Sequence, residues 1–405
     1  MARLSSILRL AQDRRYITIQ SVLEYPYEMG HLHQRDQRTD GYRVQQFSAE
    51  NLDGFLSLHE LTYGGEPTTE LFDWRYNSPY LDEIPIFVAL DDADTVVGAT
   101  AFLPFRIAAG DTAALALQPA NAMVHPEHRR NGLFSRTLTS AIDHYRESDA
   151  EFFFNFPTPP ALPALTKLGW EDVGTMPTCF RLQHPVALLN GSVPDSITPV
   201  ASRIATTVAK GHCRIRRGFA DCDPSIDVER YDDVPVDLFV DLYEENVPER
   251  VHVVKDRAYV GWRFGNPTWD TVSYVARRDG RPVTGLVACT RQANGITVTV
   301  LMSVLPSTAV DRDTDALVAV LDAVVDDHRH VDVIRVSGYS LPDSILERFD
   351  FLSNHAFPLS RVTNKTHLVT RPIVDDAEDQ WYLGGHNISG KDNWLIELAD
   401  QDAPF

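Results

Sequence analysis

The sequence predicts an α/β (α+β) protein in which one structural unit occurs twice, and three observations support this fold class. From Tyr42 onwards, strand-like alternation of apolar residues and helix-like apolar spacing follow each other along the chain. Short segments of the first half recur in the second half in the same order. The chain has 405 residues, which is more than one ordinary core accommodates and favours two domains.

The first unit begins with a strand that leads into a helix, for which Ser48 is the expected N-cap. A hairpin and a further strand follow, and the last strand runs into a polar turn and a second helix. The expected elements are a strand at 42–47, a helix at 48–64, strands at 86–90, 95–107 and 113–124, a helix at 133–148, and a strand at 151–156.

The internal repeat defines the predicted domains. Trp74 matches Trp262, Gly98 matches Gly285 and Leu138 matches Leu317, with offsets of 188, 187 and 179 residues. Matches in a constant order with similar offsets indicate two copies of one unit. The predicted division is an N-terminal extension of unclear order at 1–41, a first domain at 42–185, a linker at 186–221, a second domain at 222–372 and a C-terminal tail at 373–405.

Composition restricts the possible partners. The net charge is −20, whereas nucleic-acid affinity and binding to anionic membrane surfaces depend on clustered Lys and Arg. The sequence therefore predicts no nucleic-acid partner and no membrane partner. A dispersed acidic surface is typical of high-salt cytoplasm and predicts a halophilic, haloarchaeal protein; an ordinary acidic bacterial protein is the alternative. The N-terminus shows no signal-peptide pattern, so a cytoplasmic location is expected.

The cysteines predict neither a metal site nor a disulfide framework. No CxxC pair occurs, and a closed zinc site needs four well-spaced ligands. Free or buried thiols in a reducing compartment are the expected state. The four residues are Cys179, Cys213, Cys222 and Cys289.

The stretch MVHPEHRRNGLF, residues 123–134, is the candidate functional segment because it leaves a strand and opens a helix. A helix N-terminus offers free backbone N–H groups and a partial positive charge, which suit an anion. Gly132 allows close approach of a ligand to the backbone, and Arg129 and Arg130 can contact phosphate. A solvated polar turn is the alternative interpretation.

The second copy provides a comparison within the same chain. At the corresponding place it reads VLPSTAVDRDT, with Asp313 and Asp315 near the start of the helix. Acidic side chains there stabilise the helix but repel phosphate. Anion binding is therefore expected in one copy only.

Val124-His125-Pro126, followed by RRNGLF at 129–134, resembles the motif of the GNAT (GCN5-related N-acetyltransferase) superfamily. That motif is V-x-P followed by Arg/Gln-x-x-Gly-x-Gly/Ala and a helix. The resemblance extends to Asn155 and the KLGW segment at 167–170, and covers most of 42–185 and, in degenerate form, 222–370. It implies two tandem GNAT-like domains, each a mixed, mostly antiparallel twisted sheet flanked by helices.

The resemblance also implies a co-substrate, acetyl-CoA or another acyl-CoA, and no metal. The backbone amides of 130–135 would hold its pyrophosphate, and the strand edge would pair with the pantetheine arm. The residues implied for cofactor binding are Met123, Val124, Arg129, Arg130, Asn131, Gly132, Leu133, Phe134 and Asn155. Phe134 departs from the family's Gly/Ala, and Leu165 stands where a tyrosine often acts as the general acid, so the general acid stays unassigned.

The implied chemistry is direct acyl transfer from the CoA thioester to a primary amine, which needs an acceptor for one proton. His125, at the end of the strand, and Glu66, in the loop after the first helix, are the candidate bases. A rim histidine and a solvated loop acid are the alternatives, and a water relay needs neither. Asn121 and Gln118 are candidates for orienting the acceptor.

Three functions remain open on the sequence. The first is an acyl-CoA-dependent N-acyltransferase, in the first place an N-acetyltransferase, acting on a small-molecule or peptide amine as a monomer or homodimer. The second is a FemAB-like transferase that takes its donor from aminoacyl-tRNA, which the charge of −20 disfavours. The third is a non-catalytic acyl-CoA-binding or regulatory protein.

Overall fold

The computed structural model describes residues 41–65, 68–184, 223–293, 296–307, 313–357, 359–361, 363–374 and 378–402. The N-terminal extension predicted at 1–41, except Gly41, and the linker predicted at 186–221 lie outside these residues.

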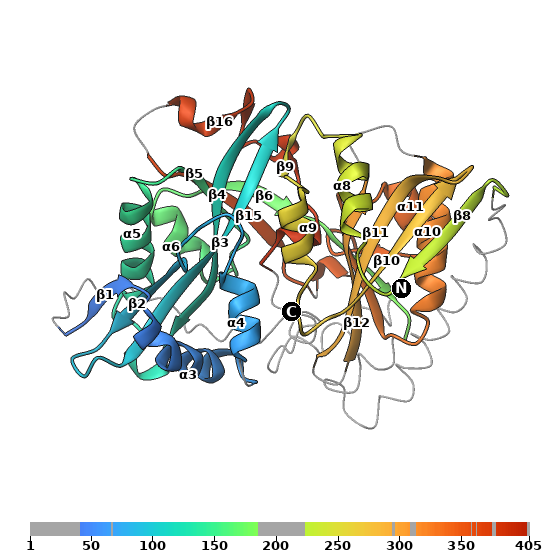
Figure 1. The fold of residues 1–405 in the computed structure, drawn as a ribbon. Helices are drawn as coiled ribbons and strands as arrows, with labels where there is room; N and C mark the ends of the chain where they lie inside the picture. Colours follow the sequence, from blue (N-terminus) through green and yellow to red (C-terminus); the bar gives the residue numbers. More distant parts are fainter. Residues whose placement is uncertain are drawn as a thin grey trace, which may run out of the picture.

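A nine-stranded sheet forms around the first half of the chain (Figure 1). Its order is β1-β2-β3-β4-β5-β15-β6, with β9 pairing with β3 and β18 pairing with β9. The strands are β1 (Arg43–Gln46), β2 (Ile86–Leu90), β3 (Val96–Ala109), β4 (Thr112–Val124), β5 (Ala150–Asn155), β6 (Glu171–Met176), β9 (Val251–Val253), β15 (Thr366–Pro372) and β18 (Trp394–Leu395).

A seven-stranded sheet forms around the second half, in the order β14-β7-β13-β12-β11-β10-β8. The strands are β7 (Thr178–Leu182), β8 (Ile226–Tyr231), β10 (Asp270–Arg278), β11 (Arg281–Ala293), β12 (Ile296–Leu305), β13 (Val333–Ser337) and β14 (Leu352–Ser353). A separate two-stranded ribbon joins β16 (Tyr382–Leu383) to β17 (His386–Asn387). Within the described residues, β4–β5, β12–β13 and β9–β18 are the parallel pairs and the others are antiparallel, which confirms the predicted fold class.

Helices cover both sheets, and their apolar faces form the core. In α5, within the helix predicted at 133–148, Leu138, Ile142 and Tyr145 are buried at helical spacing. Within the described residues, no helix combines the length and the apolar character needed to cross a bilayer. The α-helices are α3 (Leu52–Tyr63), α4 (Thr69–Tyr76), α5 (Leu133–Tyr145), α6 (Leu162–Lys167), α8 (Val236–Glu244), α9 (Arg257–Arg263), α10 (Thr314–Asp327) and α11 (Asp343–Arg348). The 3₁₀ turns are η1 (Ala49–Asn51), η2 (Pro126–His128), η5 (Leu359–Arg361), η6 (Glu378–Trp381), η7 (Lys391–Asn393) and η8 (Leu398–Asp400).

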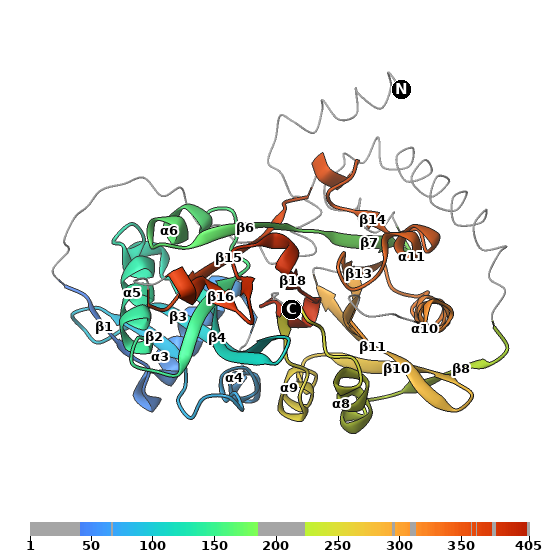
Figure 2. The ribbon, with the colours of Figure 1, turned by 90° about the horizontal axis from the view of Figure 1, so that it is seen from above.

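The two halves exchange strands. β6 lies at the edge of the first sheet, and after Pro177 the chain enters the second sheet as β7, between β13 and β14. Figure 2 shows β6 and β7 running end to end across the two halves. In return, β15 from the second half lies between β5 and β6 of the first sheet. The division into 42–185 and 222–372 stays a prediction, and the pairing shows that each half contributes a strand to the other half's sheet.

The repeated tryptophans meet at the junction of the halves. The indole Nε1 of Trp74 donates to the carbonyl oxygen of Trp262 at 2.7 Å, and the Nε1 of Trp262 donates to the carbonyl oxygen of Trp74 at 2.7 Å. Two copies of one unit that pack about an approximate twofold axis place equivalent residues opposite each other. The tryptophans therefore join the two copies.

The segment predicted as a C-terminal tail is an internal element of the fold. β18 pairs with β9, and Figure 2 shows β18 between the two halves. The side chains of Trp394, Ile396 and Leu398 are buried. Apolar burial of this kind contributes to stability in proportion to the area removed from water. The segment therefore forms part of the joint between the halves.

The two cysteines that the structure describes, Cys179 and Cys289, are free and buried, as predicted. Burial raises the pKa of the Cys179 thiol to about 11 and that of the Cys289 thiol to about 12. Both thiols are protonated near neutral pH and therefore poor nucleophiles. Cys213 and Cys222 lie outside the described residues.

We expect protonation of His252 to destabilise the folded protein at low pH, because His252 lies in the joint between the two halves. Its Nδ1 donates to the carbonyl oxygen of Arg250 at 2.6 Å, so its Nε2 accepts the hydroxyl proton of Tyr243 at 2.8 Å. Burial lowers the pKa of His252 from 6.5 to about 4. The folded state therefore binds this proton less readily than the unfolded state does, and stability present above pH 6.5 is lost as the pH falls towards 4.

The measurement is urea unfolding of the wild type and His252→Gln between pH 7.5 and 4. The wild type should lose up to about 3 kcal/mol more than the variant, whose amide does not titrate. Equal losses would show that His252 does not carry the acid sensitivity.

Candidate functional site

The turn between β4 and α5 has the backbone of an anion site. After η2, Arg130 and Gly132 both adopt left-handed conformations with φ of 69°. Gly132 is the N-cap of α5, where no side chain caps the helix, and the first helical N–H groups have no partner within the helix. A Cβ added to Gly132 would meet nothing within 4 Å, so the space in front of the turn is open. The uncapped start of α5 and the open space beside Gly132 suit an anion.

Side chains behind the turn hold it in place. The Nδ2 of Asn131 donates to the Tyr42 hydroxyl at 3.0 Å and to the carbonyl oxygen of His128 at 3.2 Å. The Tyr42 hydroxyl also lies 2.9 Å from Nδ1 of His128, and Arg136 donates to the carbonyl oxygen of Tyr42 at 2.6 Å. The side chain of Asn131, predicted as a cofactor contact, therefore fixes the turn to Tyr42, the residue before β1.

Packing holds α5 against the sheet. The hydroxyl oxygens of Thr137 and Thr100 are 2.7 Å apart in a buried contact between α5 and β3. Leu133 is buried beside Ala89, and Phe134 packs against the core under α5. The side chains of Leu133 and Phe134 thus belong to the core, and their backbone amides are what they offer to a ligand.

The charged candidates have different surroundings. Arg129 and Arg130 are exposed, and within the described residues Arg130 forms no ion pair with a carboxylate. The Nδ1 of His125 accepts the backbone N–H of Glu127 at 3.3 Å, so a role as base would fall to its Nε2. Glu66 lies outside the described residues. No group of three or more potential metal ligands occurs in the part of the chain that the structure describes.

β4 and β5 separate beside this turn. They pair in parallel from Leu115 to Leu117 on β4, and within the described residues the pairing with β5 ends there. A bulge follows in β4 where Asn121 takes a φ of 41°, and Met123 beyond it is buried. At the end of β5, the side chain of Asn155 accepts the N–H of Phe156 at 2.7 Å. The predicted positions Met123, Val124 and Asn155 thus lie at the ends of the two diverging strands.

In the second copy, a carboxylate of the chain occupies the corresponding helix N-terminus. Asp313 is the N-cap of α10, and its carboxylate accepts the N–H of Ala316 at 3.0 Å. Arg278 donates to both oxygens of the same carboxylate, at 2.5 and 2.8 Å. These hydrogen bonds lower the pKa of Asp313. At α10 Asp313 places a negative charge at the helix N-terminus, whereas no side chain caps α5.

In the second sheet, β12 and β13 are not paired beyond Leu301 within the described residues, and the C-terminal segment lies between them there. β12 and β13 pair as far as Leu301, after which Glu397 accepts the hydroxyl of Ser303 at 2.6 Å and the N–H of Val304 at 2.9 Å. Ser337 on β13 donates to the carbonyl oxygen of Ile396 at 2.9 Å. In the first sheet the C-terminal segment hydrogen-bonds to Gln118 of β4, and Trp394 stacks on Phe154 of β5 with ring centroids 5.9 Å apart.

Those contacts involve the residues predicted to orient an acceptor. The amide of Gln118 is fully buried, donates to the carbonyl oxygen of Asp400 at 2.9 Å and accepts the N–H of Asp402. Arg75 donates to the side-chain oxygen of Asn121 at 2.7 Å and forms an ion pair with Asp402. Gln118 therefore holds the chain's own C-terminal segment, and Asn121 lies between Arg75 and the bulge.

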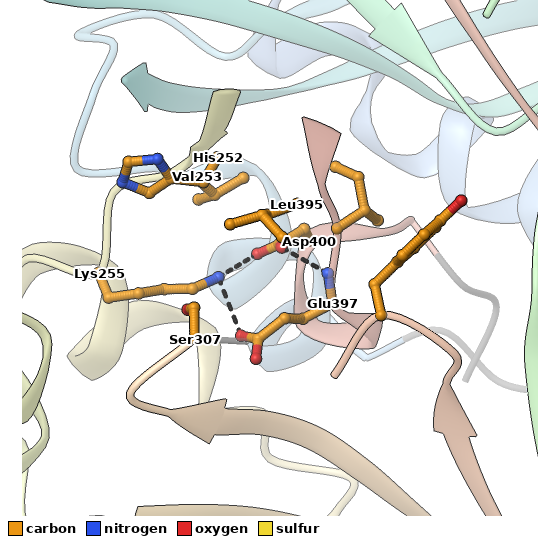
Figure 3. A pocket seen from close by; sticks show the side chains of 9 residues that line it. His252, Val253, Lys255, Ser307, Leu395, Glu397 and Asp400 are labelled. Carbon is orange, nitrogen blue, oxygen red and sulfur yellow. Dashed lines mark hydrogen bonds and ion pairs between the residues drawn. The ribbon is translucent and has the colours of Figure 1, made fainter. Parts of the chain in front are cut away.

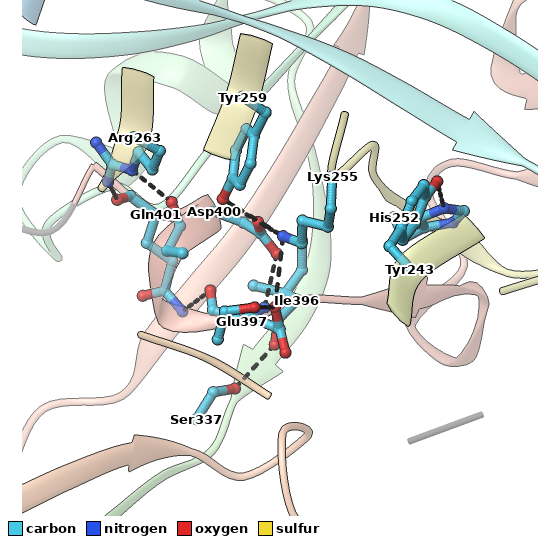
Figure 4. Close-up of polar contacts among 12 residues, drawn as sticks. Tyr243, His252, Lys255, Tyr259, Arg263, Ser337, Ile396, Glu397, Asp400 and Gln401 are labelled. Carbon is cyan, nitrogen blue, oxygen red and sulfur yellow. Dashed lines mark hydrogen bonds and ion pairs between the residues drawn. The ribbon is translucent and has the colours of Figure 1, made fainter. Parts of the chain in front are cut away.

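An ionic cluster joins the C-terminal segment to the second half (Figure 3). Lys255 forms ion pairs with Asp400 and with Glu397, the latter at 3.4 Å, and all three side chains are buried. The Tyr259 hydroxyl donates to Asp400 at 2.9 Å (Figure 4). Burial raises the pKa of Glu397, and Lys255 opposes that rise. Lys255 and Arg257 form a local basic patch in the sequence, which predicts a solvated helix face or, as the alternative, a contact with an anionic acceptor. The solvated face is wrong for Lys255, because it is buried against partners in a segment about 140 residues away.

Arg263, the repeat partner of Arg75, binds the same segment. Its guanidinium donates to the carbonyl oxygens of Ala399 at 2.6 Å and Gln401 at 2.7 Å, and Figure 4 shows it beside Gln401. Arg75 and Arg263 therefore bind the C-terminal segment. The adjacent Trp74 and Trp262 hydrogen-bond to each other. The sequence offered one signal for this, the apolar run WLIELA at 394–399.

Comparison with known proteins agrees with the fold described above. Residues 43–173 match the family model of an acetyltransferase (GNAT) domain. No curated protein sequence matches the chain. Among solved structures, the fold resembles a GCN5-related N-acetyltransferase from Anabaena variabilis, with a TM-score of 0.54, 12% identity, and coverage of 82% of this chain and 73% of that one.

Two further structures are similar. A GCN5-related N-acetyltransferase from Kribbella flavida has a TM-score of 0.52, 14% identity, and coverage of 83% of this chain and 72% of that chain. The N-myristoyltransferase of Saccharomyces cerevisiae, solved with bound myristoyl-CoA, has a TM-score of 0.56, 13% identity, and coverage of 91% and 92%. At these identities the likeness concerns the fold. Residues 43–173 thus match the model of a GNAT acetyltransferase domain, and the fold of the chain resembles those of GNAT acetyltransferases and of N-myristoyltransferase.

Proposed function

We propose that this protein is an acyl-CoA-dependent N-acyltransferase, with acetyl as the first acyl group to test. One observation carries the proposal. Two equivalent strand-turn-helix elements occur in one chain, and α5 begins at an uncapped glycine beside exposed Arg129 and Arg130, whereas α10 begins at Asp313. The amides of 130–135 would hold the pyrophosphate of acyl-CoA, and Met123 and Val124 would lie along its pantetheine arm.

The reaction would be direct transfer. A neutral primary amine attacks the thioester carbonyl, the C–N bond forms, the C–S bond breaks, and CoA leaves as the thiolate, which takes up a proton. Holding amine and thioester together supplies a large part of the rate enhancement. A backbone N–H near Val124 would stabilise the charge that develops on the carbonyl oxygen.

Calorimetry with acetyl-CoA tests binding, and release of free CoA with a panel of amines tests turnover. We expect one acetyl-CoA per chain, because Asp313 and the C-terminal segment fill the equivalent places of the second copy. Absence of binding would refute the proposal. Binding without turnover on any amine would favour the non-catalytic acyl-CoA-binding alternative.

The assays should cover molar salt concentrations. We propose that the protein is halophilic and cytoplasmic, because a net charge of −20 destabilises a compact chain unless salt screens it. The same charge speaks against an aminoacyl-tRNA donor. We propose that the protein acts as a monomer or homodimer. The proposed acceptor is a small-molecule or peptide amine.

A further inference from the structure

The backbone N–H group of Val124 points towards the side on which β4 parts from β5. The N–H of the next residue, His125, donates to the carbonyl oxygen of Val97 on β3 at 2.9 Å. Successive N–H groups of a strand point to opposite edges, so the N–H of Val124 is directed away from β3. β5 is the next strand on that side, and within the described residues its pairing with β4 ends at Leu117. The Val124 N–H is therefore placed to bind an oxygen that enters between these two strands.

The second copy of the unit shows such an oxygen in place. The Val-x-Pro sequence at 124–126 recurs at 304–306, which makes Val304 the equivalent of Val124. The N–H of Val304 donates to the carboxylate Oε1 of Glu397 at 2.9 Å, beyond the point where β12 and β13 stop pairing. A carboxylate oxygen carries the kind of negative charge that develops on a thioester oxygen under attack. By this comparison, the Val124 N–H is the donor to that oxygen in the proposed reaction.

A bulge shortly before Val124 sets the direction of this N–H group. Asn121 and Ala122 of β4 lie opposite one residue of β3, Thr100, and Asn121 takes a φ of 41°. A bulge re-aims the residues beside it, and a left-handed conformation at a residue other than glycine persists only where its surroundings hold it. The orientation of the Val124 N–H thus depends on what fixes Asn121.

Arg75 of α4 fixes Asn121. Its Nη2 donates to the side-chain oxygen of Asn121 at 2.7 Å, and the same nitrogen forms the ion pair with Asp402. The side chain of Arg75 is 15% exposed, and a hydrogen bond from a charged donor in such surroundings is stronger than one in water. Arg75 therefore holds the bulge of β4 to the C-terminal segment.

The repeat partner of Arg75 uses its guanidinium differently. In Arg263, Nε and Nη2 each donate to a separate carbonyl oxygen of the C-terminal segment. In Arg75, Nη2 serves both partners, and Nε is buried without a hydrogen-bond partner among the described residues. A buried donor without a partner costs free energy, so the placement of Arg75 does not maximise stability. Within the described residues, the hydrogen bond to a strand bulge is what distinguishes Arg75 from Arg263.

We propose that Arg75 is a positioning residue for acyl transfer, which holds the bulge so that the Val124 N–H meets the thioester oxygen. This rests on the proposed function. The oxygen gains negative charge only as the amine attacks, so the N–H binds the transition state more strongly than it binds acyl-CoA. Loss of Arg75 therefore slows the transfer step and leaves acyl-CoA binding at 130–135 intact.

The test compares kcat and both KM values of the full-length chain and Arg75→Gln, with acetyl-CoA and the best amine acceptor. We expect kcat of R75Q to fall by about 10–10²-fold, because complete removal of an oxyanion donor costs about 10²–10³-fold and a displaced donor costs part of this. KM for the amine and the calorimetric Kd for acetyl-CoA should not change. If R75Q does not fold, Arg75→Lys takes its place, since lysine keeps the charge beside Asp402 without the planar guanidinium.

Arg263→Gln is the matched control, because Arg263 binds the same C-terminal segment from the equivalent position of the repeat. In urea unfolding, R263Q should lose as much stability as R75Q, and it should keep the wild-type kcat. An equal fall of kcat in R263Q would overturn the role of Arg75, because the effect would then pass through the C-terminal segment.

A variant of Asn121 shows whether the effect of Arg75 passes through the bulge. Asn121→Gly adopts the left-handed conformation without strain but cannot accept the hydrogen bond. R75Q, N121G and the double variant should all have the same kcat, because each breaks the same contact. Losses that multiply in the double variant, or a raised KM for the amine in place of the lower kcat, would also overturn the role of Arg75. A wild type that neither binds nor turns over acetyl-CoA would overturn the proposed function and this inference with it.

Discussion

Gly132→Asp is expected to weaken acetyl-CoA binding by about 10²–10³-fold while the protein stays folded. A carboxylate at the start of α5 would stand about where a phosphate is proposed to bind. Two unit charges about 4 Å apart repel by about 4 kcal/mol at an effective dielectric constant of about 20, and each 1.4 kcal/mol corresponds to about tenfold in affinity. Isothermal titration calorimetry of both proteins at the same salt concentration measures the change.

The backbone cost of the substitution should be small. The added Cβ meets open space, and aspartate in the left-handed region costs about 1–2 kcal/mol. Gly280→Asp is the matched control, because Gly280 has a φ of 79° and equally open surroundings but lies in the turn between β10 and β11. The control should lose similar stability and keep its acetyl-CoA affinity. Equal affinities for G132D and G280D would refute the proposed cradle.

Lys255→Met is expected to destabilise the protein by about 3–5 kcal/mol. Removing the ammonium group leaves the buried carboxylates of Asp400 and Glu397 without the cation that pairs with them. An uncompensated buried charge is among the most costly single changes in a folded protein. Urea unfolding at neutral pH measures the loss as a lower midpoint with an unchanged slope.

Two further variants separate charge from packing. Arg257→Met removes the neighbouring cation, whose partner Asp237 is exposed, and should change stability by less than about 1 kcal/mol. Adding Glu397→Gln and Asp400→Asn to K255M removes the unpaired charges and should restore part of the lost stability. If K255M and R257M were equally stable, the ionic cluster would not hold the joint.

Lys255 and Arg257 differ in burial in a way that the sequence could not predict. The two residues are two positions apart and looked alike as members of one basic patch. In the structure one is buried in an ion-paired joint and the other is exposed. Local pattern could not separate them, because the carboxylates that distinguish them are about 140 residues away along the chain.

His125 is a second case. The sequence predicted it as a base at the end of the strand, and the structure shows that one ring nitrogen accepts the backbone N–H of Glu127. The role of base stays a prediction for the other ring nitrogen.

The sequence by itself determined the elements, the repeat and the difference between the two strand-to-helix turns. These depend on short-range properties: apolar periodicity, capping residues and the conformational freedom of glycine. The tertiary structure decided the exchange of β7 and β15, the burial of the C-terminal segment and the partners of Gln118 and Lys255. Strand partners and buried ion pairs depend on which distant segments meet in space, and a linear pattern does not contain that information.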